Sequence, residues 1–342
     1  MSWLRASAAA VLSFDVDAES PILNHGRRHA DNAGVMTHQA YGPLVGVPRI
    51  LALLEEYRIR GTFFVPGLTA DRYPDVVERI VGAGHEVGHH SYAHKKPVGM
   101  TEPEERADFE RALASLERLG VRPQGYRAAG WEPAWRTPAL VAEYGLVYDS
   151  SLMDDDRPYV LETQAGAIAE LPVHWSLDDW EQYAYLPEPD VGGTIEAPSK
   201  VLELWRSELD AMRRHGCLFV LTMHPFLSGR PARVEALRAL IDHALSCGDV
   251  EFVAGAEVGR RQPRPGRSQR TGTGRSPSPP SGNSAGPRRC WTRRRRPRRT
   301  GSPVPGWTTT PAGRRGHAGA RPTRFRPDAA APWRGSRQGR SL

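Results

Sequence analysis

In AVLSFDVD, residues 10–17, a mostly apolar run typical of a protein core is followed directly by two aspartates, Asp15 and Asp17. The run predicts a buried strand over residues 10–15. Residues two apart on an extended strand face the same side, so both carboxylates are expected together at the strand's end. Such a pair repels unless a cation or an arginine compensates it, which makes this end a candidate cation site. A solvated strand end is the alternative.

Apolar runs and amphipathic segments alternate along the chain as far as residue 254, and a loop is expected from the first strand to Gly42. Strands are expected at 10–15, 61–65, 85–88, 124–128, 146–148, 170–173, 217–223 and 251–254, and helices at 44–57, 74–81, 101–119, 138–144, 200–214 and 231–246. This alternation implies an α/β fold with a parallel sheet, either doubly wound or closed as a barrel. Polar residues end several of the strands, as on the active face of barrel enzymes, and this favours a barrel.

The segment HSYAH, residues 90–94, spaces two histidines four residues apart. On a helical turn this spacing brings both rings to one side, where they can share a divalent ion. One aspartate and two histidines would leave coordination positions open, which is typical of a catalytic metal site. His85 and His89 repeat the spacing and weaken the signal, since two polar loop histidines are common.

Three further segments carry chemistry-bearing residues. Arg127 in YRAAGW can place a guanidinium beside a carboxylate, although a surface arginine is the alternative. His224 in LTMHP ends a strongly apolar strand and is a candidate acid or base, or else an ordinary core histidine. In WSLDDW, residues 175–180, Asp178 or Asp179 could orient His224 while the aromatic rings line a pocket.

Together these five segments resemble the polysaccharide deacetylase (NodB homology) family over residues 10–258. The resemblance implies a distorted (β/α)7 barrel of that family's type and metal-dependent hydrolysis of a non-peptide carbon–nitrogen bond. It also implies that Asp17, His90 and His94 are the metal ligands. In the family the metal is usually zinc and sometimes another divalent ion such as cobalt.

The same resemblance assigns the acid and base roles. Asp15 would be the general base that activates water, and Arg127 would hold it in place. His224 would protonate the leaving amine, with Asp178 or Asp179 in support. A subgroup is indicated because Val16 separates two aspartates that are adjacent in the family's common first motif. That subgroup includes peptidoglycan deacetylase-like proteins, cyclic imide hydrolases and a metal-independent allantoinase, and its members often form homo-oligomers.

The substrate is the least determined part of the prediction. N-deacetylation of an acetylated sugar or polysaccharide is the family default, and a small cyclic imide or ureide is the alternative. The candidate substrate-binding residues are Tyr41, Trp131, Trp175 and Trp180, with Trp135 as a further aromatic. A catalytically inactive binding protein with a nucleic-acid-binding basic tail is a second alternative, against which the retention of all five segments argues.

Composition divides the chain near residue 260. Residues 260–342 hold 22 Arg, no Lys and one acidic residue, a charge of +21; the whole chain carries +7, so residues 1–259 carry −14. A catalytic domain is therefore predicted over 1–259 and a disordered Arg/Pro/Gly-rich tail over 260–342. Disorder without function, or a shifted reading frame in GC-rich DNA, is favoured for the tail over a nucleic-acid-binding arm, so nucleic acid is not an expected partner.

Two features bear on the compartment. The N-terminal apolar run is short and passes into Asp15 without a cleavage site, and no apolar stretch reaches the roughly 20 residues of a membrane helix. A cytoplasmic protein without a membrane partner is therefore expected. Three cysteines, of which Cys290 lies in the tail, do not suggest a disulfide framework, and Cys217 and Cys247 are expected to be buried.

Overall fold

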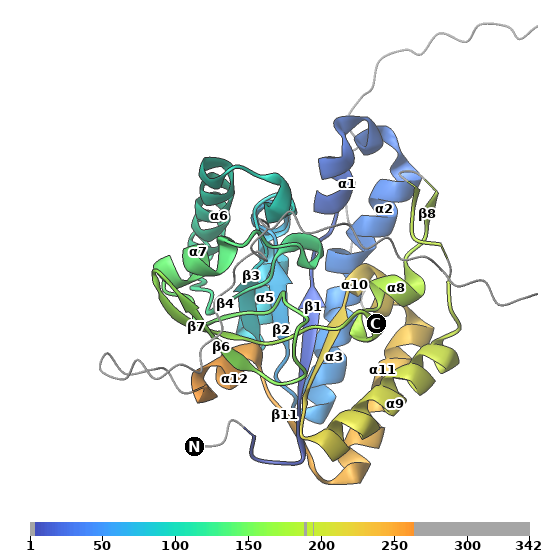
Figure 1. The fold of residues 1–342 in the computed structure, drawn as a ribbon. Helices are drawn as coiled ribbons and strands as arrows, with labels where there is room; N and C mark the ends of the chain where they lie inside the picture. Colours follow the sequence, from blue (N-terminus) through green and yellow to red (C-terminus); the bar gives the residue numbers. More distant parts are fainter. Residues whose placement is uncertain (1–3, 188–189, 194, 263–342) are drawn as a thin grey trace, which may run out of the picture. The chain divides into compact units, whose positions relative to one another are not determined.

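A computed structural model describes residues 4–187, 190–193 and 195–262 (Figure 1). Most of the predicted tail, from residue 263 onward, lies outside the described residues. Helix α12 (Gly255–Arg261) continues past the domain boundary expected at 259. Among the described residues, no helix combines the length and apolarity that crossing a bilayer requires.

The core of the described part is a sheet of nine strands in which neighbours run parallel, except for one antiparallel hairpin of β6 and β7. In order, the strands are β10 (Leu218–Met223), β1 (Ala8–Asp15), β2 (Thr62–Val65), β3 (Glu86–His89), β4 (Gly125–Tyr126), β5 (Tyr148–Asp149), β7 (Gly166–Glu170) and β6 (Tyr159–Thr163), and β11 (Val250–Phe252) pairs with β1. The α/β fold with a mostly parallel sheet is confirmed.

The ends of this sheet approach each other through the chain that follows β7. Asp178 forms an isolated parallel bridge to Thr222 of β10. Nearby, the amide of Leu218 donates to the carbonyl of Asp156 at 2.9 Å. Between the described strands, closure therefore rests on single contacts and not on a full ladder of hydrogen bonds, which gives the barrel its distorted form.

Helices flank the sheet, with α9 and α11 side by side on one flank and α6 and α7 on the other (Figure 1). Besides α12, they are α1 (Ser20–His25), α2 (Ala33–Tyr41), α3 (Val47–Tyr57), α4 (Gly67–Arg72), α5 (Pro74–Gly82), α6 (Glu102–Glu117), α7 (Thr137–Glu143), α8 (Trp180–Tyr183), α9 (Pro198–His215), α10 (Pro225–Ser228) and α11 (Pro231–Cys247). A capping box of Thr101 and Glu104 opens α6.

Alternation along β1 explains why its polar residues face the site. Leu12 and Phe14 belong to the apolar cluster shared with the outer helices. Val11 belongs to a second cluster inside the curved sheet. Ser13 and Asp15 share the parity of Val11 and therefore point inward. A one-residue shift of this strand would turn both away from the site.

Three local expectations were wrong. The predicted loop up to Gly42 contains α1 and α2, and in α2 the Asn32 side chain caps the helix by accepting from the amide of Val35 at 3.1 Å. The strand expected at 170–173 is instead the end of β7, which forms a hairpin with β6. The segment 90–94 is not a helical turn, because Ser91 and His94 adopt left-handed backbone conformations.

Candidate active site

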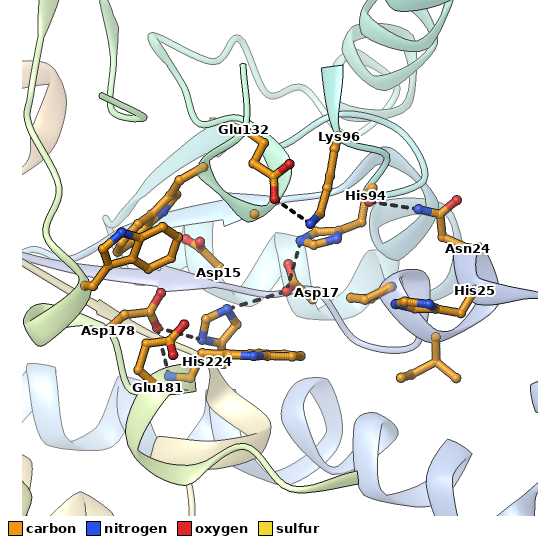
Figure 2. Close-up of a pocket in the computed structure, with 16 residues that line it drawn as sticks. Asp15, Asp17, Asn24, His25, His94, Lys96, Glu132, Asp178, Glu181 and His224 are labelled. Carbon is orange, nitrogen blue, oxygen red and sulfur yellow. Dashed lines mark hydrogen bonds and ion pairs between the residues drawn. The ribbon is translucent and has the colours of Figure 1, made fainter. Parts of the chain in front are cut away.

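The predicted metal ligands come together although they follow different strands, and Asp17 and His94 line one pocket with His90 buried behind them. Asp17 lies two residues beyond β1, and His90 and His94 lie in the irregular segment after β3. The Nε2 atom of His90 is 3.4 Å from Asp17 Oδ1, and the Nε2 atom of His94 is 3.3 Å from Asp17 Oδ2. Figure 2 shows Asp17 between His94 and His224, with Asp15 close by. The left-handed conformations of Ser91 and His94 thus bring both histidine rings to one side, which a helical turn was expected to do.

The hydrogen bonding of this group suits a divalent cation. His90 Nδ1 contacts the carbonyl oxygen of Arg127 at 2.7 Å, which places a proton on Nδ1 and directs Nε2 toward Asp17. Within the described residues, His90 Nε2 and both carboxylate oxygens of Asp17 are buried without a hydrogen-bond partner. Buried polar atoms left in this way are costly unless something compensates them. A carboxylate and two imidazoles form a ligand set that zinc and similar ions accept.

Electrostatics prepare these groups differently. Burial alone would raise the pKa of Asp17, but His94, His90 and His224 hold it well below its ordinary value. Burial lowers the pKa of His94 to about 4, and the neighbouring His90 and His224 add to this effect. The carboxylate is therefore ionised and the His94 imidazole neutral near pH 7, and these are the forms in which both side chains ligate metals.

Arg127 holds Asp15 as the resemblance implied. The guanidinium is fully buried, and its NH1 donates to Asp15 Oδ1 at 2.8 Å and to Ser13 Oγ at 3.0 Å. Its Nε and NH2 donate to the carbonyl and hydroxyl of Ser150, and its plane lies over the ring of Phe64. All three guanidinium nitrogens therefore donate hydrogen bonds, which fixes one carboxylate oxygen of Asp15. The other carboxylate oxygen faces His90 Nε2 at 3.7 Å.

His224 stands opposite, and its partner is Asp179. His224 Nδ1 is 2.7 Å from Asp179 Oδ1, and Asp179 also accepts from the His224 amide and the Ser228 hydroxyl. The Nε2 atom faces Asp17 Oδ2 at 3.6 Å. Burial would lower the pKa of His224, but its hydrogen bond to Asp179 and the charges of Asp179, Asp178 and Asp17 raise it to about 10. This imidazole therefore carries a proton that it can give.

Asp178 has a different position. Its carboxylate is 3.6 Å from His224 Nδ1, accepts from the amide of Trp180 at 2.8 Å and lines the pocket. Burial raises its pKa to about 7, against the effect of His224. The choice between Asp178 and Asp179 that the sequence left open is therefore resolved in favour of Asp179 as the hydrogen-bond partner of His224.

The cavity has a volume of about 520 Å³ and a partly aromatic wall. Trp131, Trp175 and Trp180 all line it, and the rings of Trp131 and Trp175 lie 5.0 Å apart. Tyr41 does not line it: its hydroxyl donates to the carbonyl of Gly229 and its ring lies beneath Arg230. Trp135 is also outside the lining, with 55% of its surface exposed.

Several lining residues were not predicted. Asn24 and His25 come from α1, and the Asn24 amide donates to the carbonyl of His94 at 3.2 Å. Lys96 and Glu132 form an ion pair at the rim. The position of Lys96 just after HSYAH was a usable signal, whereas α1 reaches the pocket through a tertiary arrangement that no local pattern reveals.

Comparisons with known proteins agree with this geometry. A family model described as polysaccharide deacetylase matches residues 24–148. A peptidoglycan deacetylase of Helicobacter pylori is 28% identical over 251 residues, which cover 64% of this chain and 86% of the relative. The crystal structure of a PuuE allantoinase aligns with a TM-score of 0.66 at 26% identity, covering 75% of this chain and 90% of that one.

A candidate polysaccharide deacetylase of Mycobacterium smegmatis, known from its crystal structure, is more similar. It aligns with a TM-score of 0.74 at 50% identity, and the alignment covers 76% of this chain and 92% of that one. Half of the aligned residues are thus identical over nearly the full length of the relative. The chain therefore belongs to the polysaccharide deacetylase family and is a carbon–nitrogen hydrolase.

Proposed function

We propose that this protein removes the acetyl group from an N-acetylated sugar, using a zinc ion held by Asp17, His90 and His94. The observation that carries the proposal is the set of buried, unpartnered ligand atoms on Asp17 and His90, which lie opposite His224, whose ring is hydrogen-bonded to Asp179. When bound, a divalent cation supplies Lewis-acid chemistry to the amide carbonyl and to water.

The chain's own residues supply the proton transfers. Asp15 takes the proton of the attacking water on the carboxylate oxygen that Arg127 leaves open. His224 donates the Nε2 proton to the leaving nitrogen as the carbon–nitrogen bond breaks, and Asp179 holds the ring through Nδ1. The products are acetate and a free amine, so water is the only co-reactant.

Two features support a sugar substrate. Trp131 and Trp175 provide an apolar wall on which a sugar ring can stack. Lys96, Glu132 and Asn24 offer hydrogen-bonding groups around the same cavity. The similarity to a peptidoglycan deacetylase that aligns over 86% of its length points in the same direction.

A second candidate is the hydrolysis of a small cyclic amide. The alignment with an allantoinase, over 90% of that chain, favours it. The aromatic wall can also cover a small planar ring, so the cavity lining does not separate the two candidates.

The full-length chain should be purified, its metal measured by mass spectrometry, and its activity assayed with and without added zinc. Acetate release from N-acetylglucosamine oligomers is expected, with no ring opening of allantoin or succinimide. Activity on the cyclic compounds alone would contradict deacetylation and support the second candidate function, hydrolysis of a cyclic amide. A chain that binds no divalent ion and cleaves neither class would overturn both.

A further inference from the structure

A second group of metal-ligating side chains lies on helices α9 and α11, outside the pocket. Asp210 comes from α9, and His243 and Cys247 come from α11. Residues four apart on a helix share a face, so the imidazole and the thiol both turn toward the neighbouring helix. None of the three lines the cavity of the candidate active site. The proposed deacetylation makes no use of them.

The distances suit a shared ion. His243 Nε2 is 3.0 Å from Asp210 Oδ1, and one ligand atom from each of the three residues lies within 4.8 Å of the others. Around a tetrahedral zinc with bonds of about 2.0–2.3 Å, ligand atoms are separated by roughly 3.3–3.8 Å. Small side-chain rotations would therefore bring all three to bonding distance. Asp210 and His243 are 34% and 26% exposed, so an ion can reach them from solvent.

The surroundings can accommodate the added charge. Arg213 contacts Asp210 Oδ1 at 3.1 Å, but it also contacts Asp249 at 2.7 Å and can remain there when Asp210 turns to a cation. Cys247 is the last residue of α11, where the helix dipole favours positive charge. This thiol was expected to be buried, yet it is only partly buried and thus open to chemistry.

We propose that Asp210, His243 and Cys247 form a zinc site that clamps α9 to α11, with a water completing the coordination. The class of ligand is a borderline-soft divalent cation, because an imidazole and a thiolate disfavour magnesium and calcium. Binding releases the thiol proton of Cys247 to solvent. The proton that His243 Nε2 shares with Asp210 moves to Nδ1, so the ring ligates in its neutral form.

Cobalt(II) gives a readout that the candidate active site cannot produce. Thiolate coordination to cobalt yields an intense near-ultraviolet charge-transfer band, whereas Asp17, His90 and His94 offer no sulfur. The full-length chain should carry Cys290→Ser, which removes the thiol of the tail. We expect the band to appear and to saturate at no more than two cobalt ions per chain, because the candidate active site also takes up cobalt without producing this band. We also expect one thiol to become protected from a disulfide reagent by zinc.

Matched variants decide the assignment. Cys247→Ser should abolish the band, and His243→Ala should weaken cobalt binding at least about 10-fold. Cys217→Ser should leave the band unchanged, as should Glu208→Gln, because Glu208 lies on the opposite face of α9 from Asp210. The absence of a band at saturating cobalt, or its persistence in Cys247→Ser, would overturn the proposal and leave a hydrogen-bonded Asp210–His243 pair.

Discussion

Two groups of aspartate and histidine meet at the pocket, each with one or more members in its lining, and their hydrogen bonding is opposite. In the metal-side group of Asp17, His90 and His94, both oxygens of the carboxylate lack hydrogen-bond partners within the described part of the chain. In the acid-side pair of Asp179 and His224, the carboxylate accepts from the His224 ring, the His224 amide and the Ser228 hydroxyl. The same residue types are thus unsatisfied in one group and satisfied in the other.

This difference separates the two roles. The pKa of His94 is lowered to about 4 by burial and by neighbouring histidines, so its ring is neutral and can ligate a metal. The pKa of His224 is raised to about 10 against the effect of burial, because Asp179 bonds its ring, so its ring is charged and can donate a proton. Residue type alone therefore does not assign a histidine to a metal or to a proton transfer; the partners already bonded to its neighbouring carboxylate do.

Removing a metal-side ligand should have the largest effect. In His90→Ala we expect loss of the active-site zinc, one ion per chain fewer than in the wild type, and a fall in kcat of at least about 10⁴-fold, because Lewis-acid chemistry and the orientation of Asp17 are lost together. Metal content and acetate release on the same preparation test this. His215→Ala, at an exposed position on α9, is the control and should retain both. A His90→Ala protein that stays active while binding one zinc fewer than the wild type would contradict the assignment.

Removing the acid or the base should cost activity but keep the metal. His224→Ala and Asp15→Asn are each expected to lower kcat by about 10²–10⁴-fold, the range typical of general acid–base catalysis. Zinc content near the wild-type level in both variants would separate the two groups. Loss of zinc from His224→Ala would show that this histidine belongs with the ligands, and the contrast between the groups would fail.

Asp179→Asn should have an intermediate effect, and Asp178→Asn a smaller one. Asn at 179 cannot hold a charged imidazole, so kcat should fall about 10–100-fold, as for other orienting partners, and the alkaline limb of the pH–rate profile should move to lower pH. Asn at 178 can still accept from the amide of Trp180. Equal alkaline shifts in both variants would remove the distinction drawn between these neighbours.

Stability should follow the same titration. The folded pKa of His224, about 10, lies above the unfolded value of about 6.5, so its contribution is full below pH 6.5 and is lost as pH rises through 10. Urea unfolding of chelator-treated protein between pH 7 and 10 should therefore show a steeper loss of stability in the wild type than in Asp179→Asn. Parallel curves would mean that Asp179 does not set this pKa.

Much of the fold was predictable because parallel strands leave strong local signals. The runs in β1 and β10 are almost wholly apolar, and Asp15 and His224 come at or directly after their ends. Since the carboxyl ends of parallel strands meet on one face, the grouping of Asp15, Arg127 and His224 followed from chain order alone. The family resemblance then gave each residue an expected role.

The remainder depends on geometry that spacing does not encode. The prediction of a helical turn for HSYAH was wrong because Ser91 and His94 adopt left-handed conformations. These conformations are uncommon for serine and histidine and cannot be predicted from the local sequence. Asp178 and Asp179 are adjacent, and the bridge of Asp178 to Thr222 determines which carboxylate turns to His224. Tyr41 was a candidate substrate-binding residue, yet its ring packs beneath Arg230.

Substitutions in the aromatic wall should have the smallest effect on activity. They test substrate binding, and not the contrast between the metal-side group and the acid-side pair. Trp175 is 49% exposed and lines the pocket, whereas Trp135 is 55% exposed and does not, so the two make a matched pair. A stacked ring contributes about 0.5–1.5 kcal/mol, so Trp175→Ala should raise KM for an N-acetylated sugar about 2- to 10-fold with little change in kcat. Trp135→Ala should leave KM unchanged. If Trp135→Ala raised KM for long oligomers but not for short ones, the substrate would extend beyond the cavity, and this wall would be one part of a longer binding surface.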